Sequence, residues 1–274
     1  MTARFAIALA AAASLSLSGC GAPLLKLPAG PGAPATDTAG ALAETVGRCQ
    51  SLQTLTAEVA VSGTAKGHRL RGRLTAGVAA PASARLEAVA PFGQPLFIFV
   101  ATGDDATLLL PRDGRALEHA RPEDVLDAIA GVPFGPADLR ATITGCPSEV
   151  PDRADARAFG DRWRVVAAGS SELYLNREGA AAPWRLVAVI GGGGRRWRAE
   201  YRDFKQDLPR QIHVMSVGSS DFDLQLALSQ VNVNVRLGAD AFRVTVPDSV
   251  TRITIDELRH SGPLARQPEA GDGR

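Results

Sequence analysis

The hydrophobic residues of this chain recur mainly at every second position, which is the period of a strand that buries one face. The clearest example is the segment FDLQLAL at 222–228, in which Phe or Leu alternates with Asp, Gln and Ala. In the run VNVNV at 231–235 the apolar residues move from even to odd positions. Because a slip of one residue exchanges the two faces of a strand, this change predicts a bulge or turn at Ser229 and Gln230.

Similar alternation predicts about a dozen strands, and so many strands joined by short turns form a large antiparallel sheet that must curl or close. The glycine run at 191–194 lies between two strand patterns and not between a strand and a helix, so we interpret it as a hairpin turn and not as a phosphate-binding loop. The other predicted strands span 55–64, 69–78, 84–89, 96–102, 106–110, 162–167, 172–175, 185–190, 195–204, 211–217 and 241–246.

Three segments have helical character instead. The segment 37–52 places Leu42, Val46 and Cys49 on one face. The segments 122–129 and 136–143 each begin with Pro and carry an acidic residue in the first turn, which suits a helix start. The pattern therefore predicts a mainly β (α+β) fold, in which a curved antiparallel sheet packs against an N-terminal helix and a mid-chain helical pair.

The N-terminus has the pattern of a secretory signal. Arg4 is followed by an unbroken run of apolar and small residues at 5–15, which is shorter than a membrane span. The residues Leu-Ser-Gly-Cys at 17–20 match the bacterial lipobox, in which the cysteine is lipidated and becomes the new N-terminus. The alternative is an ordinary signal peptide cut nearby, with Cys20 left as a spare thiol.

Under the lipobox hypothesis, residues 1–19 are the signal peptide and Cys20 is the lipid attachment site. Several acyl chains on one residue anchor a protein firmly, whereas a single chain does so only marginally. Gly21 stands where an Asp would signal retention in the inner membrane, so we expect a lipid anchor in the outer membrane, with the protein facing the periplasm. Pro and Gly residues at 20–39 predict a flexible tether to a domain at 40–260, and the tail at 261–274 has no periodicity and is expected to be disordered.

Composition narrows the classes of function. Apolar residues make up 45% of the chain, which allows a packed core, and a formal net charge of +1 gives no support to a nucleic-acid partner. The sequence lacks the nucleophile elbow, the phosphate-binding loop, the zinc-protease motif and the Cys-x-x-Cys pair. We therefore expect no enzymatic activity, no metal site and no cofactor; a hydrolase is the weakest of the hypotheses.

Two further cysteines, Cys49 and Cys146, are left once Cys20 carries lipid. The periplasm is oxidising, so a disulfide between them is chemically allowed. It would staple the N-terminal helix to the end of the helical pair, and the alternative is two buried thiols.

Two stretches carry a resemblance to a known family. RLEAVAPFGQPLFIF at 85–99 contains a strand, a Pro-apolar-Gly turn and an apolar strand, and the segment 108–147 contains a strand, an Asp-Gly turn, a helix, GVPF, a second helix and GCP. In this order and spacing they resemble the LolA/LolB-like outer-membrane lipoproteins, and most of all the lipoprotein receptor LolB. The chain departs from that pattern in a longer stretch at 152–183 and in extra C-terminal strands at 231–259.

The resemblance implies an unclosed half-barrel of about 11 strands, wrapped around the helices, with an apolar cavity for acyl chains. It also implies that Phe92, with Leu96 close by, forms a membrane-facing loop; the alternative is that Phe92 folds back as a lid over the sheet edge. Alternation cannot distinguish a residue that lines a cavity from one that fills a core. The residues expected to line the cavity are Phe97, Phe99, Leu108, Leu110, Trp197, Leu224 and Leu226.

Two functional hypotheses follow. In the first, a monomeric outer-membrane lipoprotein binds acyl chains of lipoproteins or lipids and helps insert them into the membrane, with a LolA-type periplasmic carrier and the inner leaflet of the outer membrane as partners. In the second, a structural or assembly lipoprotein has a packed core and binds other envelope proteins through its surface.

Overall fold

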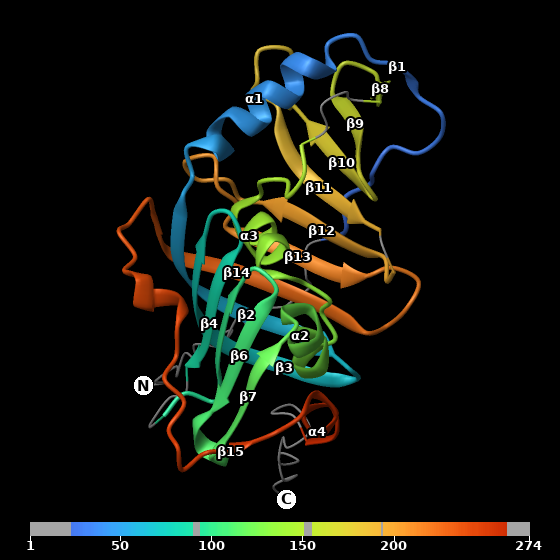
Figure 1. Cartoon of the computed structure of the whole chain (residues 1–274). Coiled ribbons are helices and arrows are strands. Elements are labelled where there is room, and N and C mark those ends of the chain that lie inside the picture. Colours follow the sequence, from blue (N-terminus) through green and yellow to red (C-terminus); the bar gives the residue numbers. More distant parts are fainter. Residues whose placement is uncertain (1–22, 90–93, 151–154, 193, 262–274) are drawn as a thin grey trace, which may run out of the picture.

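A computed structural model of the chain describes residues 23–89, 94–150, 155–192 and 194–261. They form one sheet of 15 strands in the order β1-β8-β9-β10-β11-β12-β13-β14-β2-β3-β4-β5-β6-β7-β15. The sheet does not close, and in Figure 1 it curls around the helices α2 and α3 while α1 lies across its upper end. The expected unclosed, curved antiparallel sheet is confirmed, although it has more strands than the 11 expected.

The helices are α1 (Thr38–Gln50), α2 (Pro122–Ala130), α3 (Pro136–Thr144) and α4 (Ile255–Ser261), with short 3-10 turns η1 (Pro111–Asp113) and η2 (Ala239–Phe242). The strands are β1 (Ala33–Pro34), β2 (Thr54–Ala65), β3 (His68–Ala79), β4 (Ser83–Val89), β5 (Ile98–Thr102), β6 (Asp105–Leu110), β7 (Arg115–Ala120), β8 (Ala156–Phe159), β9 (Trp163–Ala168), β10 (Ser171–Asn176), β11 (Arg185–Gly191), β12 (Trp197–Arg202), β13 (Gln211–Ser216), β14 (Phe222–Val233) and β15 (Thr251–Arg252).

The alternation in the sequence sorts the side chains between the two faces of the sheet. In β2, Leu55, Val59 and Val61 point to the concave face and are buried, whereas Glu58 and Ala60 point outward. The change of parity predicted near Ser229 is confirmed, because the pairing of β14 with β2 shifts register between Ser229 and Asn232. The concave face is therefore apolar along the long strands.

Short helices cover this concave face. Leu42, Val46 and Cys49 of α1 are buried, as their spacing predicted. Helices α2 and α3 both begin with Pro, whose missing N–H costs nothing at that position, and both end at a glycine with a positive φ, 68° at Gly131 and 66° at Gly145. Backbone signals at each end thus limit these helices to nine residues each.

A disulfide joins two parts of this cover. Cys49 of α1 is bonded to Cys146, which follows α3, with the two Cα atoms 5.7 Å apart. Both residues are buried in the main core. The bond fixes the end of α1 to the segment that leaves α3, although 97 positions separate the two cysteines in the sequence.

The segment 23–34, here called the N-terminal strap, was expected to belong to a flexible tether but lies against the outer face of the sheet. Leu25 N–H donates to both carboxylate oxygens of Glu200 at 3.1 Å, and Arg198 and Arg202 donate to the carbonyls of Leu25 and Pro23. Glu200 is completely buried and forms ion pairs with the same two arginines. A buried carboxylate needs such partners, and the strap provides part of them.

The C-terminal segment also differs from expectation. The predicted strand at 241–246 does not form: η2 lies against β4 and β5, and Arg85 donates to the carbonyls of Ala241 and Arg243. Although its sequence alternates, this segment packs on the sheet without pairing with a strand. Further on, β15 pairs in parallel with β7, and α4 packs against α2 with Leu258 fully buried.

Four strands were missed in the sequence, namely β1, β7, β8 and β15. Three of these have only two to four residues, and such lengths are too short to show a period.

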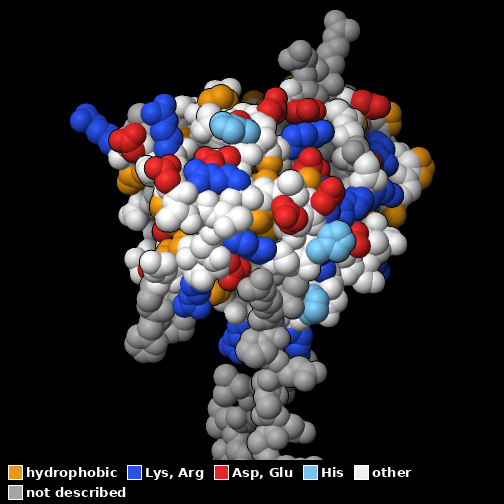
Figure 2. All heavy atoms as spheres, turned by 60° about the horizontal axis from the view of Figure 1, so that its bottom comes forward, with side chains coloured by type: hydrophobic (Ala, Val, Ile, Leu, Met, Phe, Trp, Pro, Cys, Tyr) orange, Lys and Arg blue, Asp and Glu red, His pale blue; other side chains and the backbone are white. Residues whose placement is uncertain are grey.

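Figure 2 brings the lower end of Figure 1 forward and shows acidic and basic side chains interspersed on that face. This mixture agrees with the small net charge.

Removing the disulfide tests how far the helical cover depends on it. We expect Cys49→Ser/Cys146→Ser to lower the free energy of unfolding by about 3–5 kcal/mol, because the bond closes a loop of 97 residues in the unfolded chain. Urea unfolding with and without a thiol reductant measures this. The parent should be sensitive to the reductant and the double variant should not; equal stability of the two proteins would contradict the prediction.

Candidate functional site

The concave face carries most of the residues that the sequence suggested for a cavity, but they are core residues. Phe99 and Leu108 are completely buried, Leu110 and Leu224 are nearly so, and Phe97 and Leu226 are half-buried against the same core. These side chains fill the space between sheet and helices. Of the seven candidates, only Trp197 lines the cavity that the described residues form beside α3.

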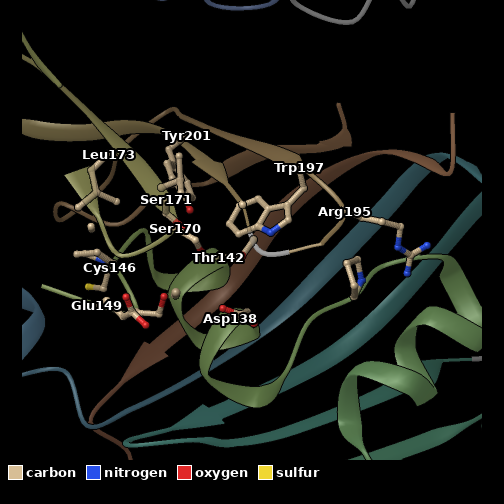
Figure 3. A pocket seen from close by; sticks show the side chains of 17 residues that line it. Asp138, Thr142, Cys146, Glu149, Ser170, Ser171, Leu173, Arg195, Trp197 and Tyr201 are labelled. Atoms are coloured by element: carbon tan, nitrogen blue, oxygen red, sulfur yellow. The ribbon is translucent and has the colours of Figure 1, made fainter. Parts of the chain in front are cut away.

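That cavity has a volume of about 340 Å³ and lies between α3 and the strands β9 to β12 (Figure 3). The volume is near the lower end of the range, about 300–1,000 Å³, that small-molecule sites occupy. Polar and apolar side chains mix in its lining, and the polar ones predominate on the surface that the cavity exposes. The strand side contributes Ser170, Ser171, Leu173, Val189, Trp197 and Tyr201, and α3 with the segment after it contributes Asp138, Ala141, Thr142, Cys146 and Glu149.

Trp197 owes its position to the glycine run that follows β11. The expected hairpin forms, since β11 and β12 pair antiparallel with Gly191 opposite Trp197. A Cβ at Gly191 would lie only 2.2 Å from Cε2 of Trp197, so the ring can pack there only because this residue is glycine. The other contact is Phe134, whose ring meets the indole edge-on at 4.9 Å between centroids.

The other two tryptophans lie elsewhere. Trp163 packs on the outer face near Leu27 of the N-terminal strap. Trp184 is buried in the core, with the guanidinium groups of Arg164 and Arg177 over its ring at 5.0 and 4.6 Å. Trp184 is therefore a core residue that lines no cavity among the described residues.

The acidic side of the cavity was missed by sequence reasoning. Asp138 stands in the first turn of α3 and accepts a hydrogen bond from Gly135 N–H at 3.3 Å. Burial raises the pKa of its carboxyl above the ordinary value, and the negative charges of Glu123 and Glu149 raise it further, against the lowering effect of that hydrogen bond. The Pro-Ala-Asp start of α3 was visible in the sequence, but it indicated a helix start and not a cavity wall.

Tyr201 and Arg195 complete the surroundings. Burial alone raises the pKa of the Tyr201 phenol, so this group stays a neutral hydroxyl in the cavity wall. Arg195 lines the cavity but its guanidinium forms ion pairs with Asp127 and, at 3.8 Å, with Asp221. Its positive charge is thus already engaged.

The predicted membrane-facing loop is described only in part. Phe92 lies outside the described residues, as do Cys20 and the signal segment. Leu96 is 44% exposed, and its N–H donates to the Ala88 carbonyl at 3.1 Å, which holds it beside the end of β4. An exposed leucine at this turn agrees with either an apolar contact or a surface residue of no special role.

Within the described part of the chain, no cluster of His, Cys, Asp and Glu could hold a metal ion. The helices described are all too short or too polar to cross a membrane.

Comparisons with known proteins define the class of fold. No family model and no curated protein matches the sequence. Among solved structures, a LolA superfamily protein from Nitrosomonas europaea has a TM-score of 0.51 at 12% identity, with 74% of this chain and 94% of that chain covered. A DUF1329 family protein from Desulfovibrio piger also has a TM-score of 0.51, at 11% identity, with 75% and 96% covered.

At such identities the likeness concerns the fold alone. The chain has the fold of the LolA superfamily, and the expected LolA/LolB-like architecture is confirmed. What the cavity holds has to be argued from its own side chains.

The raised pKa of Asp138 predicts a pH dependence of stability. The folded protein holds this proton more tightly than the unfolded chain, so stability from this group declines as pH rises above its ordinary pKa of 3.8. Asp138→Asn removes the titration. We expect the variant to gain stability relative to the parent between about pH 3.5 and pH 7 in urea unfolding; a difference that does not change with pH would contradict this.

Proposed function

We propose that this protein is a periplasm-facing lipoprotein of the outer membrane that binds an acyl chain of a lipoprotein or a lipid and helps insert it into the membrane. In this proposal it acts by binding and not by covalent catalysis. The observation that carries the proposal is the continuous apolar concave face of an open sheet, covered only by short helices with a cavity beneath α3.

The first support is energetic. Each methylene removed from water contributes about 0.8 kcal/mol, so an apolar face can take up a chain without any chemical step. A cavity of about 340 Å³ accepts one short stretch of chain. A longer chain needs more space. For α3 to provide it, Leu139 and Ile143, both buried, would have to leave the sheet while the disulfide still holds the segment after α3 to α1.

The second support concerns the anchor. The lipobox places the lipid on Cys20, and the N-terminal strap is bound to β12 from Pro23 onward. Residues 20 and 23 are at most about 11 Å apart even when fully extended. A lipid on Cys20 would therefore hold the outer face of β12 close to the bilayer, where a bound chain has a short way to travel.

The packed core favours a second candidate function. Because Phe99, Leu108, Leu110 and Leu224 are buried against neighbouring side chains, a structural or assembly lipoprotein that binds other envelope proteins also fits these residues. The two candidates differ in one measurable property, which is the affinity for a fatty acyl chain.

Filling the cavity tests acyl binding. Ala141 of α3 lines the cavity, and we expect Ala141→Leu to weaken binding of a fluorescent fatty alcohol about tenfold, because the added carbons occupy the ligand's space and about 1.4 kcal/mol is one factor of ten. Ala137→Leu, in the same helix but not in the cavity lining, is the matched control. Unchanged affinity in Ala141→Leu, or no binding by the parent, would favour the assembly role.

The membrane step is tested at the β4–β5 loop. We expect Leu96→Glu to slow delivery of a bound acyl chain to vesicles about tenfold or more, since a charged side chain costs about 2.5 kcal/mol in a bilayer. Phe92→Glu should act in the same direction while folding survives. The control is Val233→Glu, because Val233 is also 44% exposed. Delivery at the parent rate in both loop variants would remove this loop from the insertion step.

A further inference from the structure

The cavity beneath α3 contains a polar group that nothing in the protein satisfies. The Thr142 side chain is buried, with 2% of the residue exposed, and its Oγ1 has no hydrogen-bond partner among the described residues. A buried hydroxyl without a partner has a free-energy cost, because it has given up its hydrogen bonds to water. In the view of Figure 3, Thr142 lies between Trp197 and Asp138 and borders the cavity. A ligand that exchanges a hydrogen bond with Thr142 would recover this cost.

Two carboxylates in the cavity wall also lack a counter-charge. Within the described residues neither Asp138 nor Glu149 forms an ion pair, and Asp138 accepts only the Gly135 amide bond. The two groups are close enough for the negative charge of Glu149 to raise the pKa of Asp138. A cation placed between them would be attracted by both, and the partial burial of Asp138 strengthens its share of that attraction relative to the exposed Glu149.

The third observation concerns the indole ring of Trp197, which has no cation–π contact with a side chain among the described residues. Guanidinium groups stand over Trp184 and Phe204, but none of the described residues places one over Trp197. Phe134 forms a T-shaped pair with the indole, with an interplanar angle of 66°, and the indole of Trp197 also borders the cavity. Indole is the best of the aromatic partners for an organic cation.

From these three observations we propose that the cavity binds the ammonium group of an amphiphile, with Asp138 and Glu149 as its counter-charges, Trp197 as its aromatic wall and Thr142 as a hydrogen-bond partner. The chain of the amphiphile then continues along the apolar side formed by Leu173 and Val189. This part of the inference rests on the proposed acyl binding; the ammonium site does not.

The same groups discriminate against anions. A phosphate or a fatty carboxylate entering this end of the cavity would meet Asp138 and Glu149, and like charges in contact are unfavourable. Arg195 offers little compensation because Asp127 and Asp221 already pair with it. The site therefore selects for an ammonium over a carboxylate at the head of an otherwise identical chain.

The test compares hexylamine, hexanol and ethanolamine as probes of the full-length chain in a non-ionic detergent. Binding is measured as the ligand-dependent rise in the unfolding temperature, which follows from the dissociation constant by mass action. We expect hexylamine to bind at least about tenfold more tightly than hexanol. Asp138→Asn/Glu149→Gln should abolish this preference and leave hexanol binding unchanged.

Two controls keep the result interpretable. Glu44→Gln/Glu178→Gln removes the same charge from exposed residues outside the cavity and should keep the preference. The Glu149 side chain forms no hydrogen bond or ion pair among the described residues. The single variant Glu149→Gln should therefore lose part of the preference even if the double variant fails to fold.

Each outcome separates the two proposals. Hexanol binding with no advantage for hexylamine would overturn the ammonium site and leave acyl binding standing. Binding of ethanolamine and hexylamine without hexanol would support the ammonium site and count against acyl binding. If ethanolamine binds as tightly as hexylamine, the ligand is a small free amine. If hexylamine binds much more tightly than ethanolamine, the ligand is an amphiphile with an ammonium headgroup. A preference that persists in the double variant would overturn the assignment of Asp138 and Glu149.

Discussion

The rest of this structure depends on one constraint, which is that a long apolar sheet face must be kept from water although the sheet does not close. A closed barrel would cover its own interior, but here the edges β1 and β15 stay apart. The cover is supplied by short helices, and the disulfide between Cys49 and Cys146 joins α1 to the end of α3. Such a cover follows the sheet imperfectly, and the cavity lies where α3 and the strands β9 to β12 leave space between them.

Strand β12 connects the two features that matter most for function. Its residues alternate between the faces, so Trp197 and Tyr201 point to the cavity while Arg198, Glu200 and Arg202 hold the N-terminal strap on the outside. The N-terminal strap is therefore fixed directly behind the cavity. Under the proposed function, the bilayer and the bound chain are brought to opposite faces of a single strand.

The cavity is neither a plain acyl pocket nor a polar site. Its strand side combines Leu173, Val189 and two aromatic rings with Ser170 and Ser171, whereas α3 and the segment after it carry two carboxylates and a hydroxyl without a partner. An amphiphile with a positively charged head satisfies both sides, because its chain meets the apolar wall and its head meets the carboxylates. This combination connects the LolA-superfamily fold to a ligand class through side chains of this chain, and not through the likeness of folds.

The sequence by itself determined the longer strands from β2 to β6 and β9 to β14, and the helices α1 to α3, because local periodicity and Pro or Gly at helix ends act over a few residues. The bulge near Ser229 was visible for the same reason. Tertiary structure decided what local patterns do not record. Alternation marked Phe99 and Leu108 as apolar but not as core, the strap became ordered only through the distant Glu200, and α3 brought Asp138 opposite Trp197. Contacts between residues far apart in the chain depend on how the sheet curls, and no short window of sequence contains that information.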